Sequence, residues 1–92
     1  MTTQQHNRQE VYVAISRERA YQQKKWRNTE HTVGEWLLIL DSELAEAKQA
    51  WVKGRDNSEA LAEILQVASV AVACLEAHGI VERKAQPYDP TV

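Results

Sequence analysis

The chain has 92 residues, enough for one domain or for one subunit of a larger assembly. Its 11 basic and 13 acidic residues give a formal net charge of −2, which offers no bulk attraction to nucleic acid or to anionic lipid. The single cysteine, Cys74, excludes an internal disulfide framework and is typical of a reducing compartment. We therefore expect a cytoplasmic protein.

Three helices are expected, because a start signal precedes each of three helical patterns. The signal is a capping box, in which the N-cap and N3 side chains satisfy each other's exposed backbone donors. The three boxes are Asn7–Glu10, Thr32–Glu35 and Asp56–Glu59. The predicted helices span residues 8–27, 33–53 and 57–78, with Gly54 and Gly79 at the C-terminal ends. There is no strand pattern and no repeat, so the fold class is all-α.

The apolar stripe of the first helix becomes polar halfway along, continuing as Glu18, Gln22 and Lys25. Such a stripe is typical of an inner face that leaves the core and lines a cleft, although a helix that simply reaches solvent has the same pattern. Several basic residues fall within this helix. Because the helix is amphipathic and the whole chain is acidic, they do not indicate nucleic-acid binding.

Near the end of the first helix, Gln22, Lys25 and Trp26 share a face. An amide can contact a base edge, an ammonium group can contact a phosphate, and an indole can stack on a base. Arg83, which follows the third helix, could also reach a phosphate. These four residues are the candidate substrate-binding residues. Trp26 fits ordinary core packing as well.

The second helix carries a recurrent apolar stripe that is flanked by Glu43 and Glu46. Residues three apart on a helix are separated by about 300°, so the two carboxylates project from one face, one turn apart. Trp36 and Trp51 belong to the stripe and are expected in the core or at an interface.

The third helix is apolar on nearly every side: from Ala60 to Leu75, 13 of 16 residues are apolar, and the exceptions are Glu63, Gln66 and Ser69. Such a helix is buried. The run is shorter than the roughly 20 residues that span a bilayer, so no membrane partner is expected. Two sister helices cannot cover this surface, and we expect a homodimer or homotetramer to complete the helical bundle, or else a different protein partner.

An unpaired buried carboxylate is too costly to tolerate, so Glu63 needs a cation, a proton or strong donors. Glu43 and Glu46 on the neighbouring helix could face it. A group of carboxylates inside a helical bundle is, in outline, a divalent-metal site. The candidate metal ligands are therefore Glu43, Glu46, Glu63 and Gln66.

The order and spacing of these residues resemble the MazG-like superfamily of all-α nucleoside triphosphate pyrophosphohydrolases. The family signature is E-x-x-E followed after about 12–28 residues by E-x-x-D; here Glu43-Leu-Ala-Glu46 is followed after 16 residues by Glu63-Ile-Leu-Gln66. Upstream, Trp26 and His31-Thr32 are similar to the run that leads into the first acid pair of dCTP-pyrophosphatase-like members. The resemblance covers roughly residues 18–76.

The resemblance implies an enzyme that cuts a nucleoside triphosphate between the α- and β-phosphates, giving a monophosphate and pyrophosphate. Mg²⁺, or alternatively Mn²⁺, would bridge the carboxylates and the negatively charged triphosphate. Glu43, Glu46 and Glu63 would be the catalytic residues and metal ligands. Residues 1–83 would form the MazG-like domain and residues 84–92 a C-terminal tail.

The sequence departs from the family at Gln66, where the family has Asp. An amide oxygen can still coordinate a metal or hold a water, but it brings no negative charge. A weakened or inactive relative that serves as a nucleotide-binding or oligomerisation module is therefore an alternative, and so is a helical protein-interaction module. The acidic residues also have structural interpretations: Glu43 and Glu46 as solvated acids, and Glu63 as half of a buried ion pair.

Overall fold

The computed structural model describes residues 6–27, 29–54 and 56–84. Within these ranges the chain forms three helices and no strand: α1 (Arg8–Lys25), α2 (Val33–Lys53) and α3 (Ser58–His78). The all-helical prediction is confirmed, and every helix begins and ends within two residues of its expected boundary. Of the expected tail, residues 85–92 lie outside the described residues.

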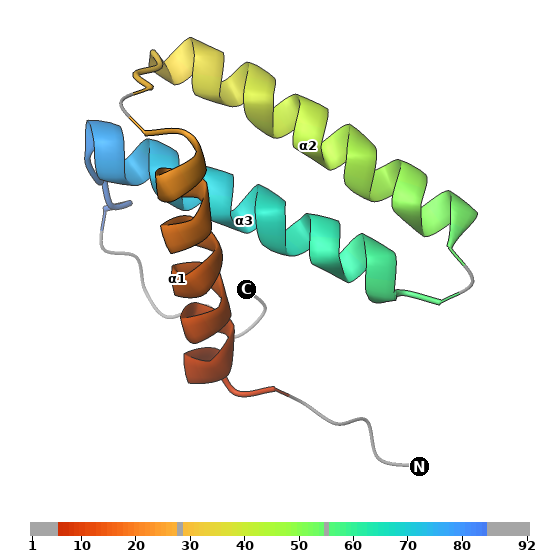
Figure 1. Cartoon of the computed structure of the whole chain (residues 1–92). Helices are drawn as coiled ribbons and strands as arrows, with labels where there is room; N and C mark the ends of the chain where they lie inside the picture. Colours follow the sequence, from red (N-terminus) through yellow and green to blue (C-terminus); the bar gives the residue numbers. More distant parts are fainter. Residues whose placement is uncertain (1–5, 28, 55, 85–92) are drawn as a thin grey trace.

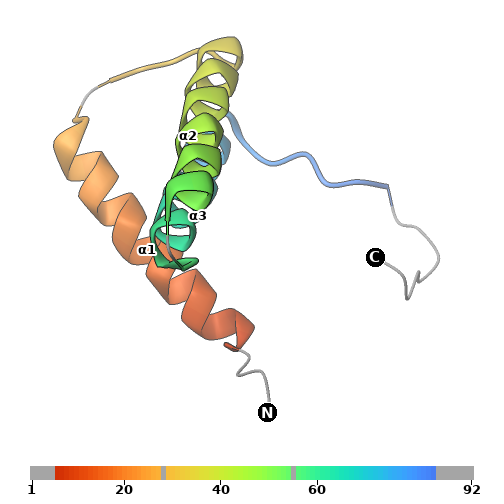
Figure 2. The same ribbon diagram turned by 90° about the vertical axis from the view of Figure 1, so that its right-hand side faces the viewer.

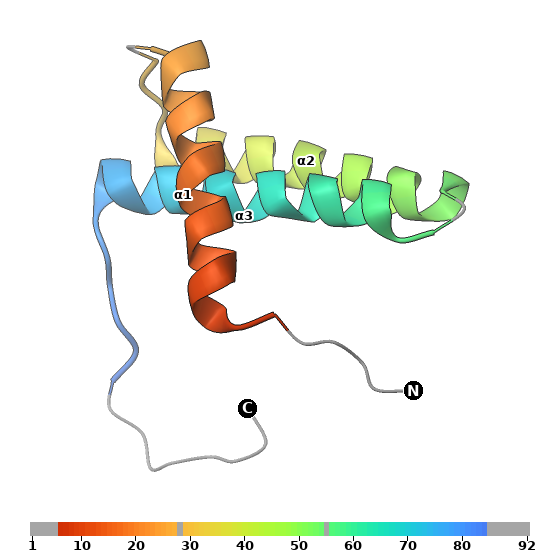
Figure 3. The same ribbon diagram turned by 60° about the horizontal axis from the view of Figure 1, so that its bottom comes forward.

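The helices α2 and α3 lie side by side and run in opposite directions (Figure 1). The helix α1 packs against α3 and crosses it steeply (Figure 3), and it is inclined away from the α2–α3 pair (Figure 2). The chain therefore forms a helical hairpin with a third helix laid across one member. This arrangement brings the C-terminal half of α1 close to the start of α2 and the end of α3.

The core of the described residues is small and lies between α2 and α3. Its buried centre consists of Trp36, Val70 and Ala73, against which three half-buried residues pack: Ile39, Leu40 and Cys74. Cys74 is thus a packing residue at the edge of the core.

One of the three predicted capping boxes is complete, and a second is half formed. The Thr32 hydroxyl accepts a hydrogen bond from the Glu35 backbone N–H at 3.1 Å, and the Glu35 carboxylate accepts one from the Thr32 N–H at 2.8 Å. At α1, the Asn7 side chain accepts from the Glu10 N–H at 2.9 Å, but the Glu10 carboxylate contacts His6 and does not complete a box.

The third predicted capping box is wrong. Asn57 is the N-cap of α3 and its side chain makes no capping hydrogen bond. Asp56 instead accepts hydrogen bonds from both the backbone N–H and the hydroxyl of Ser58, at 2.8 and 2.7 Å. This tight local turn shifts the helix start by one residue, and Glu59 is left on the exposed first turn.

Both predicted C-terminal glycines end their helices. Gly79 has φ of 97°, a left-handed conformation that a side chain rarely adopts. Gly54 has φ of −72°, and its role is steric: a Cβ there would lie 2.8 Å from the Ala50 carbonyl oxygen that accepts the Gly54 N–H.

The helix α3 is 21 residues long, and by length and composition alone it could cross a bilayer. The apolar run from Ala60 to Leu75 is shorter than a bilayer span, and the helix extends beyond that run at both ends. The core helices of soluble proteins meet the same criteria.

The outer faces of α2 and α3 are apolar. On α2 the exposed residues recur at intervals of seven: Leu37, Leu44 and Trp51. On α3, Leu61, Ile64 and Leu75 are exposed and lie on one face of the helix. Nothing among the described residues covers either face.

Candidate functional site

Three of the predicted metal ligands come together between α2 and α3. Glu43 and Glu46 lie one turn apart on α2, and Glu63 lies on α3. One carboxylate oxygen from each of the three lies within 4.8 Å of the other two. The helical spacing places Glu43 and Glu46 on one face of α2. Because α3 packs beside α2, Glu63 meets them there and completes the acidic cluster. The cluster consists of Glu43, Glu46 and Glu63.

Two oxygen atoms of the acidic cluster are buried and have no hydrogen-bond partner in the part of the chain that the structure describes. These are Oε2 of Glu43 and Oε2 of Glu63, both on half-buried side chains. Glu46 is exposed, so the cluster opens to solvent on one side. A buried carboxylate oxygen without a partner costs free energy, and a cation or a proton would remove that cost.

Among the described residues, no ion pair includes a member of the acidic cluster. In the part of the chain that the structure describes, the ion pairs are His6–Glu10 and Arg19–Glu76. Neither includes a member of the cluster. Among the described residues, Glu63 therefore has no cationic partner that would make it half of a buried ion pair. Glu43 and Glu46 form no ion pair within these residues either.

The effect of the neighbouring charges is seen in the pKa of Glu43. Burial raises the pKa of Glu43 above its ordinary value of 4.5, and the negative charges of Glu46, Glu63 and Glu18 raise it further. The positive charge of Lys25 acts in the opposite direction and does not outweigh them. At Glu43, burial and negative charge therefore outweigh the positive charge of Lys25.

The donor set fits a hard divalent cation. Carboxylate oxygens and waters are the ligands that Mg²⁺ and Mn²⁺ prefer. Glu43, Glu46 and Glu63 supply such oxygens from two helices, and Glu43 and Glu63 each have a buried oxygen without a hydrogen-bond partner among the described residues. Gln66 follows Glu63 by one turn on α3 and is half-buried.

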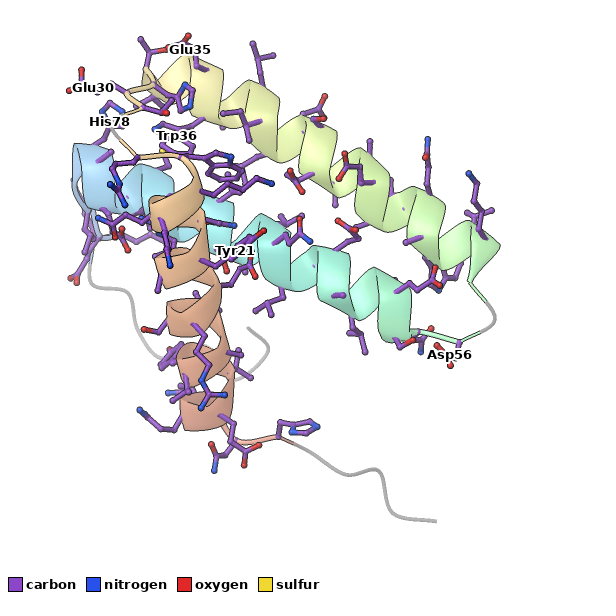
Figure 4. The ribbon with its side chains drawn as sticks, in the orientation of Figure 1. Tyr21, Glu30, Glu35, Trp36, Asp56 and His78 are labelled. Carbon is purple, nitrogen blue, oxygen red and sulfur yellow. The ribbon has the colours of Figure 1, made fainter. Side chains whose placement is uncertain are left out.

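A cavity of about 330 Å³ lies beside the C-terminal half of α1. Residues of α1, of the segment that joins α1 to α2, and of the facing ends of α2 and α3 line it. Its lining includes Arg19, Gln22, Trp26, His31, Trp36 and Glu76. Figure 4 shows Trp36 and His78 at this end of the α2–α3 pair, whereas Asp56 lies at the opposite end.

Two long-range contacts hold the walls of the cavity. Arg19 donates from Nε and Nη2 to one oxygen of Glu76, at 3.1 and 2.6 Å, which ties α1 to α3. The His78 Nε2 atom lies 2.8 Å from the His31 carbonyl oxygen and donates to it, because a carbonyl only accepts. The segment before α2 is thereby tied to the end of α3.

The structure separates the four candidate substrate-binding residues. Gln22 and Trp26 line the cavity. Lys25 is exposed; its ammonium group lies about 6 Å from the ring centroids of Tyr21 and Trp26, and its charge acts on Glu43. Arg83 is exposed in the segment that follows α3 and is not part of the cavity lining.

Glu18 and Trp36 were not chosen as site residues from the sequence. The Glu18 carboxylate accepts a hydrogen bond from Gln22 Nε2 at 3.5 Å, and its charge acts on Glu43. The polar half of the α1 stripe contained the signal for Glu18. Trp36 packs in the core, as expected, and also lines the cavity; its place in an apolar stripe gave no indication of the second role.

Comparison of the chain with protein-family models, with curated proteins and with solved structures found no match.

Proposed function

We propose that the protein is a nucleoside triphosphate pyrophosphohydrolase that uses Mg²⁺, or Mn²⁺, at the acidic cluster. The observation that carries the proposal is the convergence of three carboxylates within 4.8 Å, two of them with a buried oxygen that has no partner within the described ranges. A bound metal would supply a water of lowered pKa and would stabilise the charge that develops on the phosphates.

The residues of this chain would divide the remaining work. Glu43, Glu46 and Glu63 would hold the metal, and the exposed carboxylate of Glu46 is the one best placed to orient a water. Lys25, whose charge already acts on Glu43, would contact the phosphates as a point charge. Gln22 and Trp26 would contact the nucleoside from the cavity beside them.

A second candidate is a nucleotide-binding or oligomerisation module with weak or no catalysis. It is favoured by the neutral Gln66 one turn after Glu63, which leaves the acidic cluster with three carboxylates. Weaker metal binding would lower the fraction of protein that carries the metal, and catalysis would fall with it.

We also propose that the protein is cytoplasmic and self-associates as a homodimer or homotetramer. The support is the uncovered apolar face on both α2 and α3. A small chain with a modest core is often stabilised by association of this kind.

The activity is tested with a panel of ribo- and deoxynucleoside triphosphates, in Mg²⁺ and in Mn²⁺, scored for monophosphate and pyrophosphate. Glu63→Gln should abolish the reaction and leave the helical content unchanged. Glu59→Gln is the matched control, because Glu59 lies one turn earlier on α3, exposed and outside the cluster. Metal and nucleotide binding without turnover would favour the non-catalytic module. Loss of activity in both variants, or unfolding of Glu63→Gln, would contradict the metal-site interpretation.

A further inference from the structure

An apolar stripe repeats along the outer face of α2 at intervals of seven residues. It consists of Leu37, Leu44 and Trp51, whose side chains are 59, 43 and 66% exposed. Seven residues are almost two turns of a helix, so the three side chains lie in one row along α2. Apolar rows with this spacing form the seam between paired helices.

Two opposite charges lie beside the stripe at equivalent positions of the repeat. Asp41 follows Leu37 by four residues, and Lys48 follows Leu44 by four residues. Both are exposed, and neither takes part in an ion pair with another of the described residues. Charges beside an apolar seam decide which helices pair and in which direction.

This arrangement is nearly symmetric about Leu44. Leu37 and Trp51 lie seven residues before and after it, and Asp41 and Lys48 lie three before and four after. An antiparallel second copy of α2 therefore places Leu44 against Leu44, Leu37 against Trp51, and Asp41 against Lys48. A parallel copy would instead place Asp41 level with Asp41 and Lys48 level with Lys48, so like charges would repel.

The exposed apolar face of α3 has no such complementarity. Leu61, Ile64 and Leu75 are exposed there, but α3 carries several Glu residues and no Lys or Arg. Two copies of α3 would thus bring together charges of one sign only. The outer face of α2 is the surface that matches a second copy of itself in both apolar contacts and charge.

We infer that the outer face of α2 binds the same face of a second copy of the chain, antiparallel, about a two-fold axis beside Leu44. Each such contact carries two Asp41–Lys48 ion pairs, one on either side of the axis. This surface deepens the proposed self-association and rests on it, but it does not depend on the proposed catalysis.

The pairing leaves the rest of the molecule accessible. Glu46 is the exposed member of the acidic cluster, and it lies about 200° around α2 from Leu44, so the cluster stays open to solvent. The exposed face of α3 is free for the second contact that a tetramer requires.

Charge reversal in the full chain tests the inference. Asp41→Lys and Lys48→Asp each replace two attractive contacts by two repulsive ones. Each variant alone should weaken the association at least about tenfold and halve the mass measured by analytical ultracentrifugation at micromolar concentration. Lys53→Asp is the matched control: it makes the same charge change at an exposed position about 140° around α2 from Lys48, and it should keep the wild-type mass.

An equimolar mixture of the two variants gives the decisive result. The wild-type mass should return as an assembly of one variant with the other, because each new charge then faces an opposite charge. The double variant that combines Asp41→Lys with Lys48→Asp should recover the same mass by itself. Recovery also shows that both single variants are folded.

The outcomes separate this surface from self-association in general. Wild-type mass in both single variants leaves the self-association standing and overturns the α2 pairing, and so does a mixture that fails to recover. A monomeric wild type overturns both. Recovery in the mixture supports the α2 pairing even where the chain hydrolyses no triphosphate.

Discussion

At the scale of single residues, Glu43 is the member of the acidic cluster whose charged form is destabilised by its surroundings. Its pKa is raised, first by burial and then by three neighbouring carboxylates. Between its ordinary value of 4.5 and the raised value, the folded protein binds more protons than the unfolded chain. The contribution of Glu43 to the free energy of unfolding therefore falls as the pH rises through this window, and at neutral pH the charged cluster destabilises the metal-free fold.

We expect Glu43→Gln to raise the melting temperature of the metal-free protein at pH 7, because it removes a buried charge and its repulsions. The gain should shrink as the pH falls towards 4, where Glu43 is protonated in the wild type too. Calorimetry in EDTA at several pH values measures this. Mg²⁺ should stabilise the wild type more than the variant. A gain that does not depend on pH would contradict this account.

Gln66→Asp should raise the affinity for divalent cations several-fold, because it adds a charged oxygen ligand one turn after Glu63. Isothermal titration with Mg²⁺ and Mn²⁺, with and without a non-hydrolysable triphosphate, measures the change. Asp is one methylene shorter than Gln, so Gln66→Glu controls for reach. Unchanged binding in both variants and in Glu43→Ala would show that these residues do not face a common metal.

At the scale of the elements, the helix starts differ in how firmly they are capped. Thr32 and Glu35 satisfy each other's backbone donors at the start of α2, whereas the Asn57 side chain at the start of α3 makes no capping bond. The start of α2 also follows His31 directly, so this cap helps to hold one wall of the cavity.

Thr32→Ala should lower the free energy of unfolding by about 1 kcal/mol, the usual cost of losing an N-cap side chain. Asn57→Ala is the matched control and should cost less, because no hydrogen bond is lost. Urea denaturation of the two variants beside the wild type gives both values. Equal losses at the two positions would contradict the assigned caps.

At the scale of the whole molecule, the large apolar residues of the described chain are more often exposed than buried. The buried apolar residues among those described are few and mostly small, while large residues such as Leu38, Trp51, Leu61 and Ile64 are exposed on α2 and α3. The cost of exposing them would be removed by a second copy that covers the same faces.

Light scattering should therefore give a mass of two or four times 10.5 kDa at micromolar concentration. Ile64→Glu, on the exposed face of α3, should shift the protein towards the monomer because it places a charge in the interface. Val81→Glu adds the same charge at a position 96% exposed beyond the helix and should change nothing. A monomeric wild type would rule out self-association.

Local spacing in the sequence was enough to determine the three helices and the acidic cluster. The helical period places Glu43 and Glu46 on one face, and a short connection between two long helices makes those helices neighbours, so Glu63 can meet the pair. The shifted start of α3 was missed because several side chains around Asp56 compete for the same backbone donors, and their spacing alone does not decide which bond forms.

Only the tertiary structure decided where α1 lies. Its packing on α3 includes contacts between residues far apart in the chain, such as that of Arg19 with Glu76. No local periodicity contains this information, because the crossing angle is set by how side chains of two helices interlock. That packing brings Gln22 and Trp36 to one cavity and leaves Arg83 outside it. The acidic cluster thus follows from the period of the helix, and the cavity beside it follows from long-range packing.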